Sequence, residues 1–109
     1  MMDTQFSKRA DDQFVGAVDF RRWPLGAADY LVQSNPRGSL EILVEDESGA
    51  DVTSSLTGPE GLWISGPGLD LVNFWIIGGI EGQRYKIVVG APTSEGEFLT
   101  AVVYLSILP

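Results

Sequence analysis

The chain has 109 residues, of which 44% are hydrophobic and 20% are charged, and its formal net charge is −8. This length supports one domain with one hydrophobic core, and the composition is that of a globular protein, not a disordered one. The negative charge argues against nucleic acid as a partner, because phosphate binding needs clustered Lys and Arg. Cysteine and histidine are both absent, which excludes disulfides and thiolate metal sites and removes the commonest general base.

Residues 1–13 are polar and have no hydrophobic periodicity. They are predicted to form a frayed terminus or, alternatively, an arm that becomes ordered only on assembly. Residues 14–109 are predicted to form the single domain, which begins with a strand at Phe14–Phe20, rich in β-branched and aromatic residues. The sequence RRWPLG at 21–26 then forms a bend, because its proline has no N–H to donate to a strand ladder.

The middle of the chain is predicted to alternate short strands with turns. Ala27–Gln33 is the next strand, and SNPRG at 34–38 has the residues of a turn. Leu40–Glu45 is a half-buried strand, since its first, third and fifth residues are all apolar. The sequence DESGAD at 46–51 forms an acidic turn. LWIS at 62–65 is either a brief strand or a loop that plugs one end of the domain.

Three stronger strand patterns follow. Asp70–Ile77 has apolar residues on both faces, whereas a strand of a one-domain sandwich normally has one exposed face. Its spare face is therefore either covered by a loop or presented to another chain. Tyr85–Val89 and Phe98–Leu108 are separated by a hairpin loop at 90–96. One face of Phe98–Leu108 is continuously apolar, and it consists of Leu99, Ala101, Val103, Leu105 and Ile107. Val102 and Tyr104 lie on its other, mixed face. About seven extended segments without helical periodicity predict an all-β, immunoglobulin- or fibronectin-like β-sandwich of about seven strands.

A glycine-rich corner precedes the penultimate strand. Tyr85 lies at the start of that strand, three residues after Gly82, and this spacing matches a tyrosine corner, in which the ring packs inward and the hydroxyl bonds to upstream backbone. Gly82 is expected to allow a close approach and a positive φ. We predict that Trp75, Gly78, Gly79, Gly82 and Tyr85 determine the fold at this corner.

The sequence contains no catalytic motif that we recognise. A histidine, a nucleophile elbow, a P-loop and a helix-opening dinucleotide fingerprint are all missing. The acidic turn at 46–51 lacks the EF-hand pattern, which favours a solvated turn over a calcium site. No apolar run reaches about 18 residues and no signal-peptide pattern is visible, so we expect no membrane span and no membrane partner. We therefore expect a protein that is not an enzyme and has no metal or cofactor.

Three segments carry a family resemblance: DFRRW at 19–23, FWIIGGIEGQRY at 74–85 and the turn TSEG at 93–96. Together they resemble the tailed-bacteriophage fibre-tail adaptor proteins, in which a V-W-L-x-G-G-x-x-G-x-x-Y run leads into a final strand pair. Here phenylalanine and isoleucine replace the valine and leucine, and the other motif residues match. The resemblance covers residues 14–108.

The resemblance implies a bacteriophage virion structural protein, an adaptor at the neck or tail that joins the head-tail connector or the tail to fibres. It implies other virion proteins as partners, a homo-oligomeric ring or repeated copies, and a location in the virion, which is assembled in the host cytoplasm. One alternative is a capsid decoration or head-closure protein. Another is a small carbohydrate-binding β-sandwich module, which would use surface tryptophans such as Trp23, Trp63 and Trp75.

Charge is distributed unevenly, because residues 1–37 are neutral overall whereas residues 38–109 hold ten acids against Arg84 and Lys86. The cations of the first third are expected to dock on an acidic surface of a neighbouring subunit or of another virion protein. Trp23 is either a plug for one end of the sandwich or a contact anchor. The candidate interface residues are Lys8, Arg9, Phe14, Arg21, Arg22, Trp23, Trp63, Phe74, Val102 and Tyr104.

Overall fold

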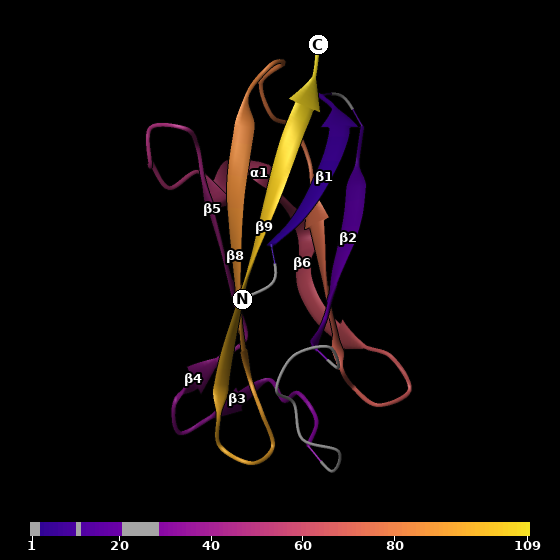
Figure 1. Ribbon diagram of the computed structural model, residues 1–109, viewed down its shortest axis with the longest axis vertical. Helices are drawn as coiled ribbons and strands as arrows, with labels where there is room; N and C mark the ends of the chain where they lie inside the picture. The colour runs from indigo at the N-terminus through magenta and orange to yellow at the C-terminus, as the bar shows by residue number, and fades with distance from the viewer. Residues whose placement is uncertain (1–2, 11, 21–28) are drawn as a thin grey trace.

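The structure is a computed structural model that describes residues 3–10, 12–20 and 29–109. The fold is all-β, as predicted (Figure 1). A short helix, α1 (Thr53–Leu56), lies between two of the strands. The strands are β1 (Asp3–Arg9), β2 (Phe14–Asp19), β3 (Ser34–Asn35), β4 (Gly38–Ser39), β5 (Glu41–Glu45), β6 (Thr57–Ser65), β7 (Leu71–Ile76), β8 (Arg84–Pro92) and β9 (Phe98–Leu108).

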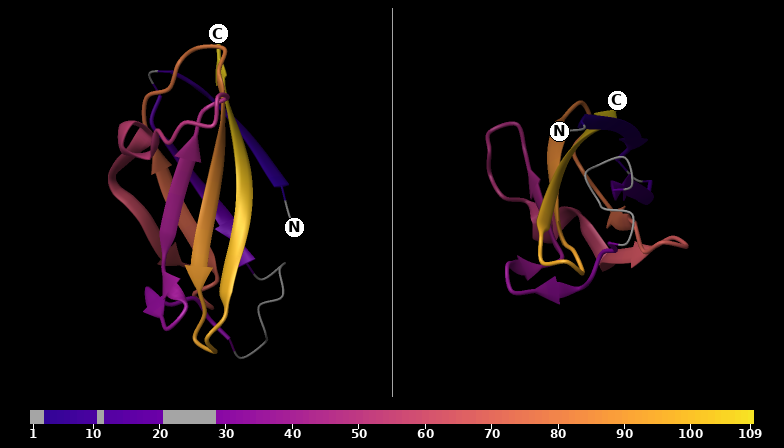
Figure 2. Two further views of the ribbon diagram at one scale, coloured as in Figure 1. Left: turned by 90° about the vertical axis from the view of Figure 1, so that its left-hand side faces the viewer. Right: turned by 60° about the horizontal axis from the view of Figure 1, so that its bottom comes forward.

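Two sheets form the body of the molecule, with strand orders β1-β9-β8-β5 and β2-β7-β6. Figure 2 shows them as two layers, one in front of the other. Strands β1 and β9 pair in parallel, from Asp3 opposite Val102 to Arg9 opposite Leu108, and the other described pairs are antiparallel. The β3-β4 hairpin lies at one end of the molecule, beside the turn between β8 and β9 (Figure 1).

The hydrophobic core fills the space between the two sheets. Every second residue of a strand points to the same face, and the predicted inner face of β9 is buried along its whole length. This face consists of Leu99, Ala101, Val103, Leu105 and Ile107. Opposite it, Val72, Phe74 and Ile76 of β7 have 0% exposure. Full burial of such a side chain contributes about 1.5–3 kcal/mol, so these two strands supply much of the stabilisation.

Strand β1 is a correction to the prediction of a frayed terminus. Phe6 of β1 packs against Phe14 of β2 and Phe74 of β7, with ring centroids 5.1 and 6.1 Å away, so the strand is anchored in the core of the same molecule. This strand was not predicted because the next inward-facing residue after Phe6 is Lys8, and a lysine interrupts the apolar alternation typical of a core strand.

Strand β8 is longer than predicted. It extends through Gly90 to Pro92, residues that we assigned to a hairpin loop, and the turn is confined to residues 93–97. The absence of a side chain at Gly90 lets the ring of Phe98 pack against this part of the strand, since a Cβ there would lie 2.7 Å from the ring. The Thr93 N–H then donates to the Glu97 carbonyl at 2.8 Å and closes the turn.

The predictions for two other segments had different outcomes. Ala27–Gln33 is not a strand in its described part, where Leu31 makes an isolated bridge to Thr93 and the Leu31 N–H donates to the Leu69 carbonyl at 2.9 Å. LWIS at 62–65 is the end of β6, so its strand alternative is confirmed and the plugging-loop alternative is wrong.

Candidate interaction surfaces

The predicted interface residues lie in four different settings. Arg21, Arg22 and Trp23 lie outside the described residues. Phe74 and Lys8 are 0% and 4% exposed, which corrects their assignment to a surface. Of the remaining residues, Phe14 is half-buried against Phe6 and Phe74, and Arg9 is exposed. Trp63, Val102 and Tyr104 lie on the outward sides of the two sheets.

Lys8 fastens β1 to the glycine corner. Its Nζ donates to the carbonyl oxygens of Arg9 at 2.5 Å, Gly78 at 2.6 Å and Ala10 at 3.3 Å. A buried ammonium group is tolerated only when hydrogen bonds replace its lost hydration, and these three acceptors do so. Lys8 therefore acts inside the molecule, in place of the contact with a neighbour that we expected from its charge.

The glycine corner is a tyrosine corner, as predicted. The Tyr85 hydroxyl accepts a hydrogen bond from the Ile80 N–H at 3.1 Å, and the Tyr85 side chain is 3% exposed. Gly82 has φ +80°, and a Cβ at this residue would meet no atom within 4 Å, so the positive φ alone favours glycine there. The close approach is at Gly79 instead, where a Cβ would lie 2.7 Å from Ile107. The positive φ at Gly82, the close approach at Gly79 and the Tyr85 hydrogen bond are therefore all features of the fold itself.

The outer face of the four-stranded sheet is organised in rows that cross β5, β8 and β9. One row is apolar, with Leu43 opposite Val88 and Val88 opposite Val102. The next row along the strands places Lys86 opposite Tyr104. Leu43 is 36% exposed, whereas Val102 is 8% exposed. Val102 therefore lies on the predicted face but offers little area of its own.

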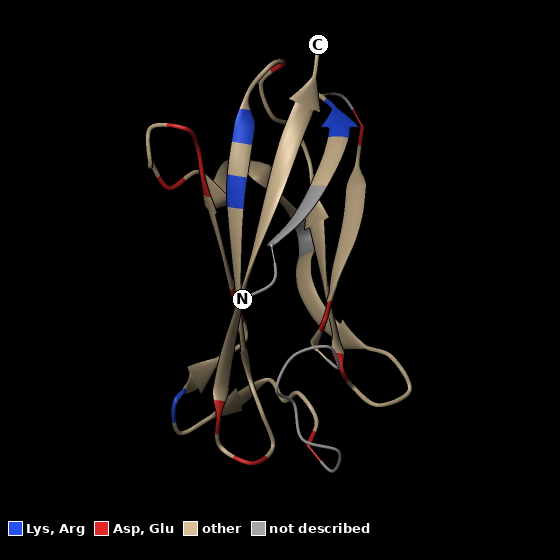
Figure 3. Cartoon of the chain, in the orientation of Figure 1, with Lys and Arg blue, Asp and Glu red and all other residues tan. Residues whose placement is uncertain are grey.

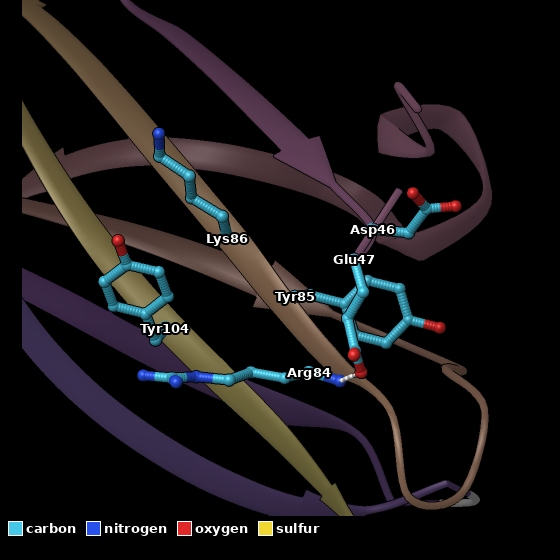
Figure 4. Close-up of a pocket in the computed structure, with 6 residues that line it drawn as sticks. All are labelled: Asp46, Glu47, Arg84, Tyr85, Lys86 and Tyr104. Atoms are coloured by element: carbon cyan, nitrogen blue, oxygen red, sulfur yellow. Dashed lines mark hydrogen bonds between the residues drawn. The ribbon is translucent and has the colours of Figure 1, made fainter. Parts of the chain in front are cut away.

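A basic pair lies at one end of this face, where β8 passes the acidic loop that follows β5 (Figure 3). Arg84 and Lys86 come together there with Tyr104, beside a shallow hollow of about 300 Å³ (Figure 4). The Arg84 guanidinium lies 4.5 Å from the centroid of the Tyr104 ring, a cation–π contact. The backbone N–H of Arg84 donates to Glu47 Oε1 at 2.8 Å. Sequence reasoning missed this basic pair, although two cations at alternate positions of one strand were the available signal.

The outer face of the three-stranded sheet carries Trp63 and Trp75. Trp63 is opposite Asn73 across β6 and β7, and Trp75 is two residues further along β7 on the same side. The Asn73 amide donates to the Ser65 hydroxyl at 2.5 Å. Val15 of β2 lies opposite Trp75 and is 57% exposed. The spare face predicted for Asp70–Ile77 is therefore half-buried and partly apolar.

The acidic turn after β5 uses its carboxylates to bind its own backbone. Asp46 Oδ1 accepts hydrogen bonds from the Ser48 hydroxyl at 2.6 Å and from the Ala50 N–H at 3.0 Å. These bonds lower the pKa of Asp46, the Ser48 hydroxyl most strongly. Asp51 accepts from the hydroxyl and N–H of Thr53 in the same way, and its pKa is lowered too. The turn is stabilised by its own carboxylates, which agrees with the prediction of a solvated turn.

A second carboxylate, that of Asp29, ties the segment before Leu31 to the β8–β9 turn. Its Oδ1 accepts from the Ser94 hydroxyl at 2.5 Å, the Tyr30 N–H at 2.9 Å and the Glu95 N–H at 3.1 Å. Partial burial raises the pKa of Asp29, but the combined hydrogen bonds outweigh it and leave the pKa below its usual value of 3.8. The folded state therefore stabilises the ionised form of Asp29.

Within residues 3–10, 12–20 and 29–109, no three His, Cys, Asp or Glu side chains form a group that could hold a metal ion. A helix long and apolar enough to cross a membrane is also missing from this part of the chain. No protein-family model and no curated protein sequence matches the chain.

Proposed function

We propose that this protein is a non-enzymatic structural subunit of a bacteriophage virion, an adaptor at the neck or tail that packs beside other virion proteins in repeated copies. The observation that carries the proposal is the nature of the two outer sheet faces. One presents Trp63 and Trp75, and the other presents Arg84 and Tyr104 beside an apolar row. Aromatic residues and arginine are enriched at protein interfaces, so a small domain with such residues on two opposite faces is suited to contact more than one neighbour.

We further propose that the domain is an immunoglobulin-like β-sandwich. Lettered A to G in chain order, the seven longer described strands give one sheet B-E-D and another A-G-F-C. A constant-type immunoglobulin domain has the sheets ABED and CFG, so the strand orders differ in the place of the first strand. The tyrosine corner at the start of strand F, here β8, is the second feature that supports this fold.

Density-gradient fractionation of phage particles tests the virion role. An antibody raised against the protein is expected to detect it in the particle fraction, and immuno-electron microscopy is expected to place the label at the neck or tail. Label over the capsid would support the decoration or head-closure alternative instead. Detection only among soluble proteins would refute a structural role in the virion.

A carbohydrate-binding module is the second candidate function, and the placement of Trp63, Asn73 and Trp75 on one sheet face favours it. Planar tryptophan side chains with an amide between them are suited to stack on and hydrogen-bond a sugar ring. Titration with soluble glycans is expected to give saturable quenching of tryptophan fluorescence if this function is correct. The quenching should then be lost in Trp63→Ala, while Trp23→Ala serves as a comparison for a tryptophan on another segment.

A further inference from the structure

Each main sheet ends in two edge strands, which are β1 and β5 in one sheet and β2 and β6 in the other. An unprotected edge presents unpaired N–H and C=O groups to which a strand of another molecule can add. Folded proteins usually prevent this addition with charged side chains, proline, bulges or a covering segment. The four edges of this protein differ in how many of these protections they have.

Three of the edges are protected. Strand β5 has Glu41 and Glu45, and its far side is occupied by the segment that follows it, since Glu45 bridges to Asp51 and the Val52 N–H donates to the Val44 carbonyl at 2.8 Å. Strand β6 has a break in its register between Thr57 and Leu62, within the sequence TGPEGL. Strand β1 ends in a lysine and an arginine.

Strand β2 has the fewest of these protections. Its one charged residue is Asp19 at the last position, it contains no proline, and its register with β7 runs without a bulge from Phe14 to Asp19. No described strand other than β7 pairs with it. Two of its outward side chains are both apolar and exposed: Val15, which is 57% exposed, and Ala17. Among the described strands, β2 is the edge best suited to accept another strand.

We propose that β2 pairs antiparallel with β2 of a second copy of the chain across a two-fold axis, which joins two three-stranded sheets into one six-stranded sheet. Self-complementarity is the reason for choosing a second copy as the occupant. A two-fold contact requires a surface that is complementary to itself, and the Phe14–Val18 segment provides one because it has no charged side chain to repel its own copy. The net charge of −8 opposes association over the other surfaces of two chains, so the contact is confined to this strand pair.

Side-chain direction fixes the register of this pair. Residues 15, 17 and 19 point outward and must stay on one face of the joined sheet, so the axis passes through Gly16 or Ala17. A centre at Ala17 would place Val15 opposite Asp19 of the second copy. A centre at Gly16 places Val15 opposite Ala17, apolar against apolar, and moves Asp19 away from the axis. We therefore assign the Gly16 register.

The mass of the protein in solution tests the pairing. Light scattering coupled to gel filtration is expected to show a concentration-dependent dimer, and Val15→Lys is expected to weaken it about tenfold or more, because a charge is added to an uncharged strand pair. Thr100→Lys is the matched control, since Thr100 is exposed on the outer face of the other sheet and is expected to leave the dimer unchanged. Circular dichroism verifies that both variants fold. A single-chain mass at every concentration would overturn the pairing, as would a dimer that Val15→Lys does not weaken.

Cross-linking tests the register separately. The natural chain has no cysteine, so an oxidised mixture of Val15→Cys and Ala17→Cys is expected to give a disulfide-linked heterodimer. A cross-link formed by Ala17→Cys alone would overturn the Gly16 register in favour of the Ala17 register, and no cross-link in either sample would overturn the strand pairing. Self-pairing of β2 is independent of the virion role, which the particle experiment tests by itself.

Discussion

Replacement of Lys8 by methionine is expected to destabilise the protein by about 2–4 kcal/mol. Methionine fills a similar volume in this site, where Lys8 is 4% exposed, but it has no donor for the Gly78 and Arg9 carbonyls that Nζ contacts at 2.6 and 2.5 Å. A hydrogen bond to a charged group contributes about 1.5–3 kcal/mol net, so two short bonds set an upper range of about 3–6 kcal/mol. Both acceptor residues are exposed enough to regain water, which lowers the expected cost.

Urea denaturation followed by tryptophan fluorescence measures this change, because the chain has three tryptophans. Arg9→Met is the matched control. It makes the same replacement one residue along β1, at an exposed position, and is expected to change the free energy of unfolding by less than about 0.5 kcal/mol. If Lys8→Met and Arg9→Met had the same midpoint as the natural protein, the idea that the buried ammonium fastens β1 would be wrong.

Four further predictions concern the corner and one carboxylate. Tyr85→Phe removes the hydroxyl that accepts from Ile80 at 3.1 Å and is expected to lower the free energy of unfolding by about 0.5–1.5 kcal/mol; an unchanged denaturation midpoint would contradict the corner. Gly82→Ala adds a Cβ in open space at φ +80° and is expected to cost about 1–2 kcal/mol. Gly79→Ala is expected to cost more in the same titration, because its Cβ also lies 2.7 Å from a core side chain; equal costs would show that steric contact is unimportant there. Because the folded-state pKa of Asp29 is lowered, the stability it contributes is present above its usual pKa and is lost as the pH falls through the lowered value. Thermal melts should therefore show Asp29→Asn less stable than the natural protein at neutral pH, with the difference shrinking as the pH falls below the usual carboxyl pKa, and a difference independent of pH would refute this.

Patterns that depend on neighbouring residues predicted much of this fold. The bounds of Phe98–Leu108 and its inner face were correct, because strict alternation of apolar residues reports burial directly. The Tyr85 corner was also correct, since its geometry is encoded within a few residues. Strand β1 could not be recognised in the same way, because the acceptors that allow Lys8 to be buried include the carbonyl of Gly78, 70 residues away.

The candidate surfaces were harder to predict than the fold. Periodicity placed Val102 and Tyr104 on the outward side of β9 but gave no information on the strand beside it, and Arg84 was therefore not associated with Tyr104. Phe74 was assigned to an interface because both faces of its strand are apolar, and only the packing of the second sheet shows which face is inside. Cross-strand register is a property of the assembled sheets, so single-strand patterns do not contain it.

The parallel pairing of β1 with β9 has a consequence for how this domain folds. It joins the Asp3 region to the Val102 region, so the two paired strands are the first and the last of the described strands. Closing such a long loop is slow compared with forming hairpins such as β8–β9. Until β1 is in place, β9 is an open edge strand that other chains can reach, and this interval of folding is when the domain is most exposed to misassembly.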